Sequence, residues 1–97
     1  MSEILIKKLT EDEIQEMGIR SWSTWSCDKS EFPWEYSEKE SCYILEGQVD
    51  VTTENGEIVS IGPGDYVIFP QGMKCAWLVH EAVYKHFSFE WFFESDF

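Results

Sequence analysis

The sequence predicts a small all-β domain, either a sandwich or a barrel, with one short helix near its start. Short segments of alternating apolar residues recur at even spacing from residue 40 onward, and glycine and proline separate them. An Asn-Gly pair at residues 55–56 lies between two such segments, which is the strongest short-range signal for a β-hairpin. A chain of 97 residues is one domain, 1–97, and buries roughly 65% of its unfolded surface.

The N-terminal part of the chain predicts a short strand followed by a short helix. Residues 3–9 (EILIKKL) have strand character, and residues 10–18 (TEDEIQEMG) have the spacing of a capping box. In that motif Thr10 accepts from the Glu13 amide and Glu13 reaches back to Thr10. Ile14 and Met17 share one face and Gly18 ends the helix, so we expect the helix to serve packing.

The rest of the chain reads as β-structure. Residues 20–28 alternate loosely, and two strands are expected to meet at Gly47. A tight turn at residues 62–65 (GPGD) is favoured because Pro63 fixes φ and both glycines tolerate positive φ. Including the pair that meets at Gly47, the expected strands are 40–47, 48–53, 57–62, 66–70, 73–80 and 83–93.

Charge and cysteine content exclude several classes of partner and compartment. The formal net charge is −12, with seven basic residues, so we expect binding neither to nucleic acid nor to anionic membrane. The three cysteines contain no CxxC pair, and no secretory signal or long apolar run is present. The sequence therefore predicts a cytoplasmic protein, or one from a plant organelle if a transit segment is missing.

Two motifs resemble the signature of the cupin superfamily. Glu40 is followed by six residues and Gly47; further on, Gly64 is followed at fixed offsets by Pro70, Gly72 and Cys75. This resembles the cupin motifs E-x6-G and G-x5-P-x-G-x2-H-x3-N, and the likeness covers residues 32–79. It implies a small single-domain cupin, an RmlC-like jelly-roll β-barrel.

The metal ligands of the superfamily are mostly replaced here. By the resemblance, the two histidines of the first motif fall on Trp34 and Tyr36, the histidine of the second falls on Cys75, and only Glu40 remains. An indole cannot coordinate a metal and a neutral phenol is a poor ligand, so we expect no metal cofactor. A divalent metal would need a modified set of Glu40, Cys75 and His86.

The stretch FPWEYSEKESCYILEG at residues 32–47 resembles a narrower group, the ureidoglycine aminohydrolase-like cupins. These are bacterial and plant proteins, mostly of unknown function. The resemblance does not carry over aminohydrolase activity, since that chemistry uses a metal held by histidines that this chain lacks.

Strand alternation predicts which side chains share the interior. Glu40 and Cys42 share one face, and Cys75 and Trp77 share another. Together with residues carried over from the motifs, this predicts a ligand pocket made of Trp34, Tyr36, Glu40, Cys42, Cys75, Trp77 and His86.

Each pocket residue has a functional and a structural interpretation. Burial would make Glu40 a general acid or base, Tyr36 could donate to a substrate or only bond to Glu40, and Cys75 could act as a nucleophile or only pack. Trp34 and Trp77 either line a ligand site or plug the barrel. The other candidate is His86, which shares a face with Tyr84, Ser88 and Glu90, opposite Phe87, Phe89 and Trp91; patterning places it in solvent, and a polar pocket would turn it inward.

Three functions follow from these interpretations. The first is a metal-free protein that binds or transforms a small uncharged or cationic metabolite with Glu40 and Tyr36, and with Cys75 and His86 as further candidates. The second is a metal-dependent enzyme that uses Glu40, Cys75 and His86, and the third is a non-catalytic module whose barrel Trp34 and Trp77 fill. The aromatic tail at residues 87–93 would cover a sheet edge or form a homodimer contact.

Overall fold

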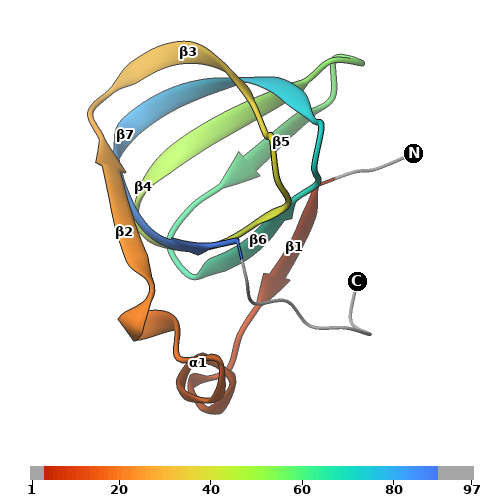
Figure 1. Cartoon of the computed structure of the whole chain (residues 1–97). Coiled ribbons are helices and arrows are strands. Elements are labelled where there is room, and N and C mark those ends of the chain that lie inside the picture. Colours follow the sequence, from red (N-terminus) through yellow and green to blue (C-terminus); the bar gives the residue numbers. More distant parts are fainter. Residues whose placement is uncertain (1–3, 90–97) are drawn as a thin grey trace.

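The computed structural model describes residues 4–89 and is mostly antiparallel β-structure with one short helix (Figure 1). The prediction of an all-β barrel with a short N-terminal helix is confirmed, while residues 90–93 of the predicted last strand and tail lie outside the described residues. The elements are β1 (Leu5–Lys8), α1 (Glu11–Met17), the 3-10 turn η1 (Ile19–Ser21), β2 (Ser23–Cys27), β3 (Ser30–Glu35), β4 (Glu40–Thr53), β5 (Ile58–Ile61), β6 (Asp65–Phe69) and β7 (Lys74–Ser88).

Two long strands, β4 and β7, organise the barrel. They pair with each other from Ser41–Ser88 to Thr53–Cys75, and every shorter strand except β1 pairs with one of them. Strands β6 and β5 pair with successive parts of β4, β2 and β3 pair with successive parts of β7, and β1 extends the sheet from β6. The strands curve around a common interior, which Figure 1 shows end-on.

The predicted break at Gly47 is wrong, because β4 runs through it as one strand. The register between β4 and β7 shifts between Ile44 and Val49, so the irregularity is a set of β-bulges rather than a turn. Gly47 has φ 104°, and a Cβ there would lie 2.6 Å from both the Ala82 oxygen and the Val83 Cα. Glycine is therefore required where the two long strands bend against each other. The predicted break after residue 80 is likewise absent, since β7 is continuous.

The two predicted turns are confirmed. At the Asn-Gly pair, β4 and β5 form an antiparallel hairpin in which the Thr53 amide donates to the Glu57 carbonyl at 2.8 Å. At the GPGD turn, Gly64 has φ 89° and the Gly62 amide donates to the Asp65 carboxylate at 2.8 Å.

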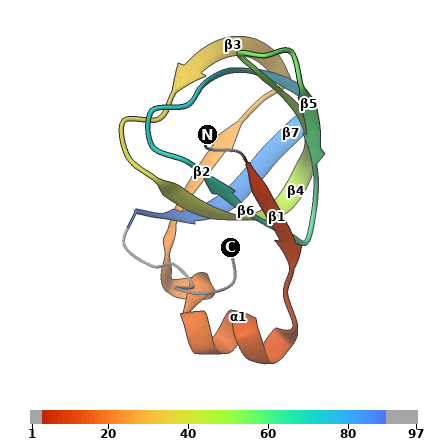
Figure 2. The ribbon, with the colours of Figure 1, turned by 90° about the vertical axis from the view of Figure 1, so that its right-hand side faces the viewer.

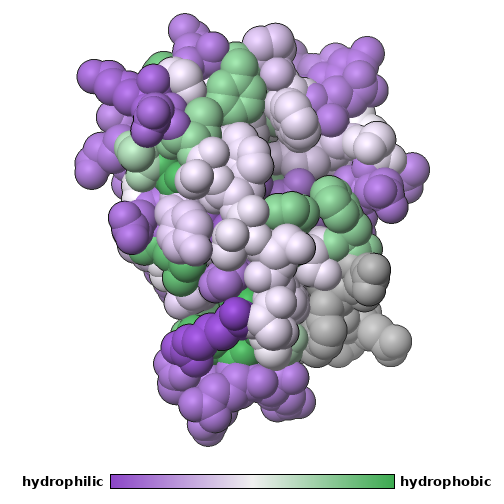
Figure 3. Space-filling view, turned by 60° about the vertical axis from the view of Figure 1, so that its left-hand side comes forward, coloured by the Kyte–Doolittle hydropathy of each residue, from purple (hydrophilic) through white to green (hydrophobic). Residues whose placement is uncertain are grey.

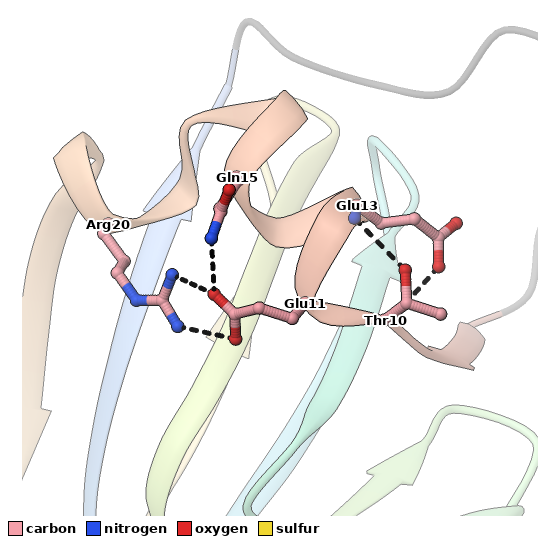
Figure 4. A network of polar contacts seen from close by, with 5 residues as sticks. All are labelled: Thr10, Glu11, Glu13, Gln15 and Arg20. Carbon is pink, nitrogen blue, oxygen red and sulfur yellow. Dashed lines mark hydrogen bonds and ion pairs between the residues drawn. The ribbon is translucent and has the colours of Figure 1, made fainter.

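Helix α1 is capped as predicted (Figure 4). The Glu13 amide donates to the Thr10 hydroxyl at 3.2 Å, and the Thr10 amide donates to the Glu13 carboxylate at 2.9 Å. Gly18 follows with φ 67°, a left-handed cap. Arg20 then donates twice to the Glu11 carboxylate, at 2.6 and 3.0 Å, which ties η1 to the start of the helix.

The helix lies at one end of the barrel and covers its outer surface (Figure 2). Ile14, Met17 and Ile19 pack against Tyr66 and Ile68 in a cluster separate from the barrel interior. Strand β6 is therefore buried on both faces, because its other face belongs to the interior cluster. Between residues 4 and 89, no helix is long and apolar enough to cross a membrane.

Candidate functional site

A cavity of about 280 Å³ opens at the end of the barrel formed by β2, β3 and the adjoining ends of β4 and β7. Its volume equals that of roughly nine water molecules in the liquid, which suits a small metabolite. On the side of the molecule nearest β2 and β3, the centre of the surface is pale or green and hydrophilic groups surround it (Figure 3). The cavity is lined by Trp25, Phe32, Trp34, Tyr36, Glu40, Trp77, Lys85, Phe87 and Phe89.

A buried ion pair lies in the wall of this cavity. The Lys85 ammonium donates to the Glu40 carboxylate, with 2.7 Å between Nζ and Oε2, and the two side chains are only 6% and 8% exposed. The same ammonium lies 4.9 Å from the ring centroid of Trp77 and 5.2 Å from that of Trp25, within cation–π range. One carboxylate and two indole rings thus stabilise the positive charge of Lys85.

The strand pattern explains how the two charges meet. Glu40 begins β4 on the same face as Cys42 and Ile44, which belong to the interior cluster, as the alternation predicts. On β7, Lys85 lies between Val83 and Phe87 on the inward face. Sequence reasoning missed Lys85; the available signal was a lysine in register with two apolar residues on a barrel strand.

Tyr36 and Trp77 both line the cavity, but the Tyr36 hydroxyl and the Trp77 indole nitrogen are themselves buried. Tyr36 stacks on Phe69 with 4.6 Å between ring centroids, and its backbone bonds to Met73 and Gly72 fix its position after β3. Within the described residues, neither the Tyr36 hydroxyl nor the Trp77 indole N–H makes a hydrogen bond of normal geometry. The interpretation that Tyr36 bonds to Glu40 is therefore wrong, because Glu40 bonds to Lys85 instead.

Burial keeps the Tyr36 hydroxyl neutral. Desolvation raises its pKa far above the usual range, and the nearby Glu40 carboxylate raises it further. A neutral phenol can both donate and accept a hydrogen bond.

The remaining walls are aromatic. Phe32 lies almost parallel to Trp77, with 6.1 Å between centroids and 19° between planes, and Trp25 meets Trp77 edge-on at 6.0 Å. Trp77 is buried, whereas Trp34 is 51% exposed at the rim. Trp77 packs in the interior cluster, as the core-filling interpretation predicts, but a cavity remains beside both tryptophans, so they do not fill the barrel completely.

The two predicted pocket cysteines lie in the packed interior and do not line the cavity. Cys42 is fully buried, and desolvation raises its pKa to about 12. Burial also raises the pKa of Cys75. Both therefore remain protonated thiols near neutral pH, which makes the nucleophilic role considered for Cys75 a poor fit to its surroundings.

His86 does not join the pocket, which corrects that prediction. It lies on the opposite face of β7 from Lys85 and Phe87, and its Nδ1 is 3.2 Å from the Trp22 carbonyl oxygen. It is also not in solvent, the other prediction, because it is 9% exposed. The physical reason is a second layer: the Trp22 segment covers the outer face of β7 here.

The donor set does not fit a metal ion. Across residues 4–89, no group of three or more His, Cys, Asp or Glu side chains is arranged to hold one. Glu40 is bonded to an ammonium, and His86 lies on the far side of the strand. The modified ligand set of Glu40, Cys75 and His86 is therefore not assembled.

Comparison with protein families gives one match over most of the chain. Residues 14–87 match the family described as the EutQ-like cupin domain. Among solved structures, a DUF861 family protein from Thermotoga maritima is 45% identical, with a TM-score of 0.88 over 90% of this chain and 99% of that one. The predicted cupin fold is confirmed, while the resemblance to the ureidoglycine aminohydrolase-like group stays a prediction.

Other solved structures share the fold at low identity. A putative ethanolamine utilization protein Q from Salmonella typhimurium is 21% identical, with a TM-score of 0.60 over 87% of this chain and 66% of that chain. The Clostridium difficile EutQ protein is 20% identical, with a TM-score of 0.61 over 87% of this chain and 59% of that chain. A search of curated proteins finds no match.

Proposed function

The chain belongs to the EutQ-like cupin domain family, and we propose that it binds a small uncharged metabolite in the aromatic cavity, without a metal ion, around Glu40 and Lys85. The observation that carries the proposal is an open apolar cavity with the Glu40–Lys85 ion pair in its wall. Ligand sites are typically apolar concavities with a few convergent polar groups, which describes this cavity.

The charge of the cavity selects an uncharged ligand. Lys85 offsets the charge of Glu40, so neither sign of ligand charge has a free counter-charge in the cavity wall. An ammonium has three donors, and the hydrogen bond found for Lys85 in residues 4–89 uses one, to Glu40. A neutral molecule with a carbonyl or hydroxyl could accept from Lys85 while its flat apolar part stacks on Phe32 or Trp77.

A metal-dependent function is disfavoured by the chemistry of the donors. A cation entering beside Glu40 would meet the Lys85 ammonium 2.7 Å from the carboxylate oxygen and be repelled. Metal analysis of protein purified without a histidine tag tests this. Stoichiometric zinc, copper or manganese that resists dialysis would overturn the metal-free part of the proposal.

Tryptophan fluorescence tests ligand binding, because Trp25, Trp34 and Trp77 line the cavity. We expect some members of a panel of small neutral carbonyl and amide compounds to change the emission in a saturable way. The double variant Glu40→Gln with Lys85→Met should bind about 10- to 100-fold more weakly, because hydrogen bonds to charged groups contribute about 1.5–3 kcal/mol. Lys74→Met, an exposed position on the same strand, is the matched control and should bind normally. Equal binding by the double variant and the control would refute the proposed site.

A further inference from the structure

Lys85 is the amine that the barrel places in the cavity. Among residues 4–89 it is the one lysine that lines the cavity, and it is 5% exposed, whereas Lys8, Lys29, Lys39 and Lys74 are exposed. Indole faces lie near it at 4.9 and 5.2 Å, so its surroundings exclude much of the water that hydrates a surface ammonium. Lysines desolvated in apolar pockets are the ones that serve as amine nucleophiles.

Glu40 supplies the proton acceptor that an amine nucleophile needs. Its carboxylate is already bonded to Nζ at 2.7 Å, so a proton can pass between the two without rearrangement. A carboxylate that takes the proton of the ammonium leaves two neutral groups in a low-dielectric cavity, and it then holds a proton to return. Glu40 can thus act first as a base toward Lys85 and then as an acid.

From this geometry we propose that Lys85 forms an imine with an aldehyde or ketone group of a small apolar molecule bound in the cavity, with Glu40 moving the protons. The inference rests on the proposed function, because it requires a ligand in that cavity. It names the substrate class, a carbonyl compound, and the reacting atom, Nζ of Lys85.

The step balances without any further reagent. Glu40 takes a proton from the ammonium, and the Nζ lone pair attacks the carbonyl carbon while the C=O π electrons move to oxygen. The oxygen takes the second proton of nitrogen, giving a neutral carbinolamine. Glu40 then protonates the hydroxyl group, which leaves as water as the C=N bond forms. The products are water and a positively charged iminium beside the Glu40 carboxylate, so the ion pair is restored.

A purely structural role for the ion pair explains less. A buried ion pair can often be replaced by apolar residues with no loss of stability, so stability alone does not account for a lysine at this position. Packing alone also does not explain why the pair borders an open cavity.

A second cluster of polar side chains lies on the surface, where Asp50 bonds to both Ser60 and His80. The carboxylate lies between the hydroxyl and the imidazole, so these three residues cannot relay a proton from serine to histidine.

Reductive trapping tests the proposal on the native protein. We would incubate it with benzaldehyde and cyanoborohydride near neutral pH, measure the intact mass, and locate the modified lysine by peptide mapping. The six lysines of the chain react in the same tube. We expect Lys85 to be labelled at least about tenfold faster than the exposed lysines, because the cavity holds the aldehyde beside it. Equal labelling of Lys85 and the exposed lysines, or labelling of the exposed lysines alone, would overturn the proposal without any variant.

Variants then test the part played by Glu40. Glu40→Gln should slow labelling of Lys85 by about 100-fold with exposed lysines unchanged, since it removes the proton carrier. Lys74→Arg is the matched control and should leave the labelling of Lys85 as it was. Circular dichroism confirms that each variant is folded before labelling, and an unchanged rate in folded Glu40→Gln would remove Glu40 from the mechanism.

The same experiment separates this inference from the proposed function. Benzamide resembles benzaldehyde in size and shape but does not condense with amines. If benzamide binds in the cavity by tryptophan fluorescence while benzaldehyde leaves Lys85 unlabelled, imine formation is refuted and ligand binding stands. If no neutral compound of the panel binds and Lys85 is not labelled, both are refuted.

Discussion

The ion pair between Glu40 and Lys85 predicts a pH-dependent cost when its cation is removed. In Lys85→Met, the carboxylate stays in the apolar wall without its counter-charge, and breaking such buried pairs typically costs about 3–5 kcal/mol. The side chain can avoid burying a charge by taking up a proton. An exposed glutamate titrates near pH 4.3, so protonation at pH 7 costs about 3.7 kcal/mol and sets a ceiling on the loss.

This upper limit on the loss of unfolding free energy decreases as the pH is lowered, so the variant should be less destabilised at lower pH. At pH 5, protonating the carboxyl costs only about 1 kcal/mol, so Lys85→Met should lose about 3 to 3.7 kcal/mol at pH 7 but about 1 kcal/mol at pH 5. For a chain of this length the loss at pH 7 lowers Tm by roughly 15–30 °C. Urea denaturation followed by circular dichroism at both pH values measures the two free energies of unfolding.

Two further variants complete this test. Glu40→Gln combined with Lys85→Met removes both charges and should recover to within about 1 kcal/mol of the native protein at either pH. Lys74→Met, which removes an exposed lysine from the same strand, should show no such dependence on pH. A loss for Lys85→Met that is the same at pH 5 and pH 7, or a double variant as unstable as the single one, would refute the reasoning.

Three other substitutions test the fold and its titration. Gly47→Ala should cost about 2–6 kcal/mol of unfolding free energy, because it combines a positive φ with backbone contacts of 2.6 Å. Gly56→Ala, where φ is 87° and nothing lies within 4 Å of the added Cβ, should cost only about 1 kcal/mol. Similar urea midpoints for the two variants would contradict this. Burial raises the pKa of Cys42 from 9.0 to about 12, so the contribution of this thiol to stability should be intact below pH 9 and fall by about 1.4 kcal/mol per pH unit up to pH 12. Tyr36, whose pKa is also raised, adds to the loss above pH 10, so Cys42→Ala should reduce the slope in alkaline titrations without removing it. Thr10→Ala should cost about 1 kcal/mol and Thr10→Ser much less, and equal thermal melts for the two would show that the cap bond does not matter.

Local signals in the sequence were sufficient for most of the fold. The capping box at Thr10, the Asn-Gly hairpin and the turn at Gly64 all involve residues within a few positions of each other, and each forms as predicted. Gly47 shows the limit of such reasoning. A positive φ fits both a turn and a bulge, and the choice depends on β7, whose contacts with Gly47 are more than thirty positions away.

The site was less predictable because its key contact is long-range. The inward placement of Glu40 followed from the resemblance to cupins, and alternation put Cys42 on the same face. The partner of Glu40, Lys85, is 45 residues away, and no pattern within one sequence pairs them. His86 was misplaced because strand alternation assigns a face without showing what covers it. The β3 strand was not predicted either; Pro33 interrupts its pattern, although proline is tolerated on a strand that, in the described chain, pairs on one side only.

The Lys85 ammonium gives the Glu40 carboxylate a tethered counter-ion. A metallocofactor has to be acquired from the cell and can be stripped by a chelator, whereas a side-chain cation is present as soon as the chain folds. The position of the Lys85 ammonium beside the carboxylate is fixed by the β7 backbone and does not depend on nutrient supply. The electrostatic character of this part of the barrel wall is therefore set when the chain folds.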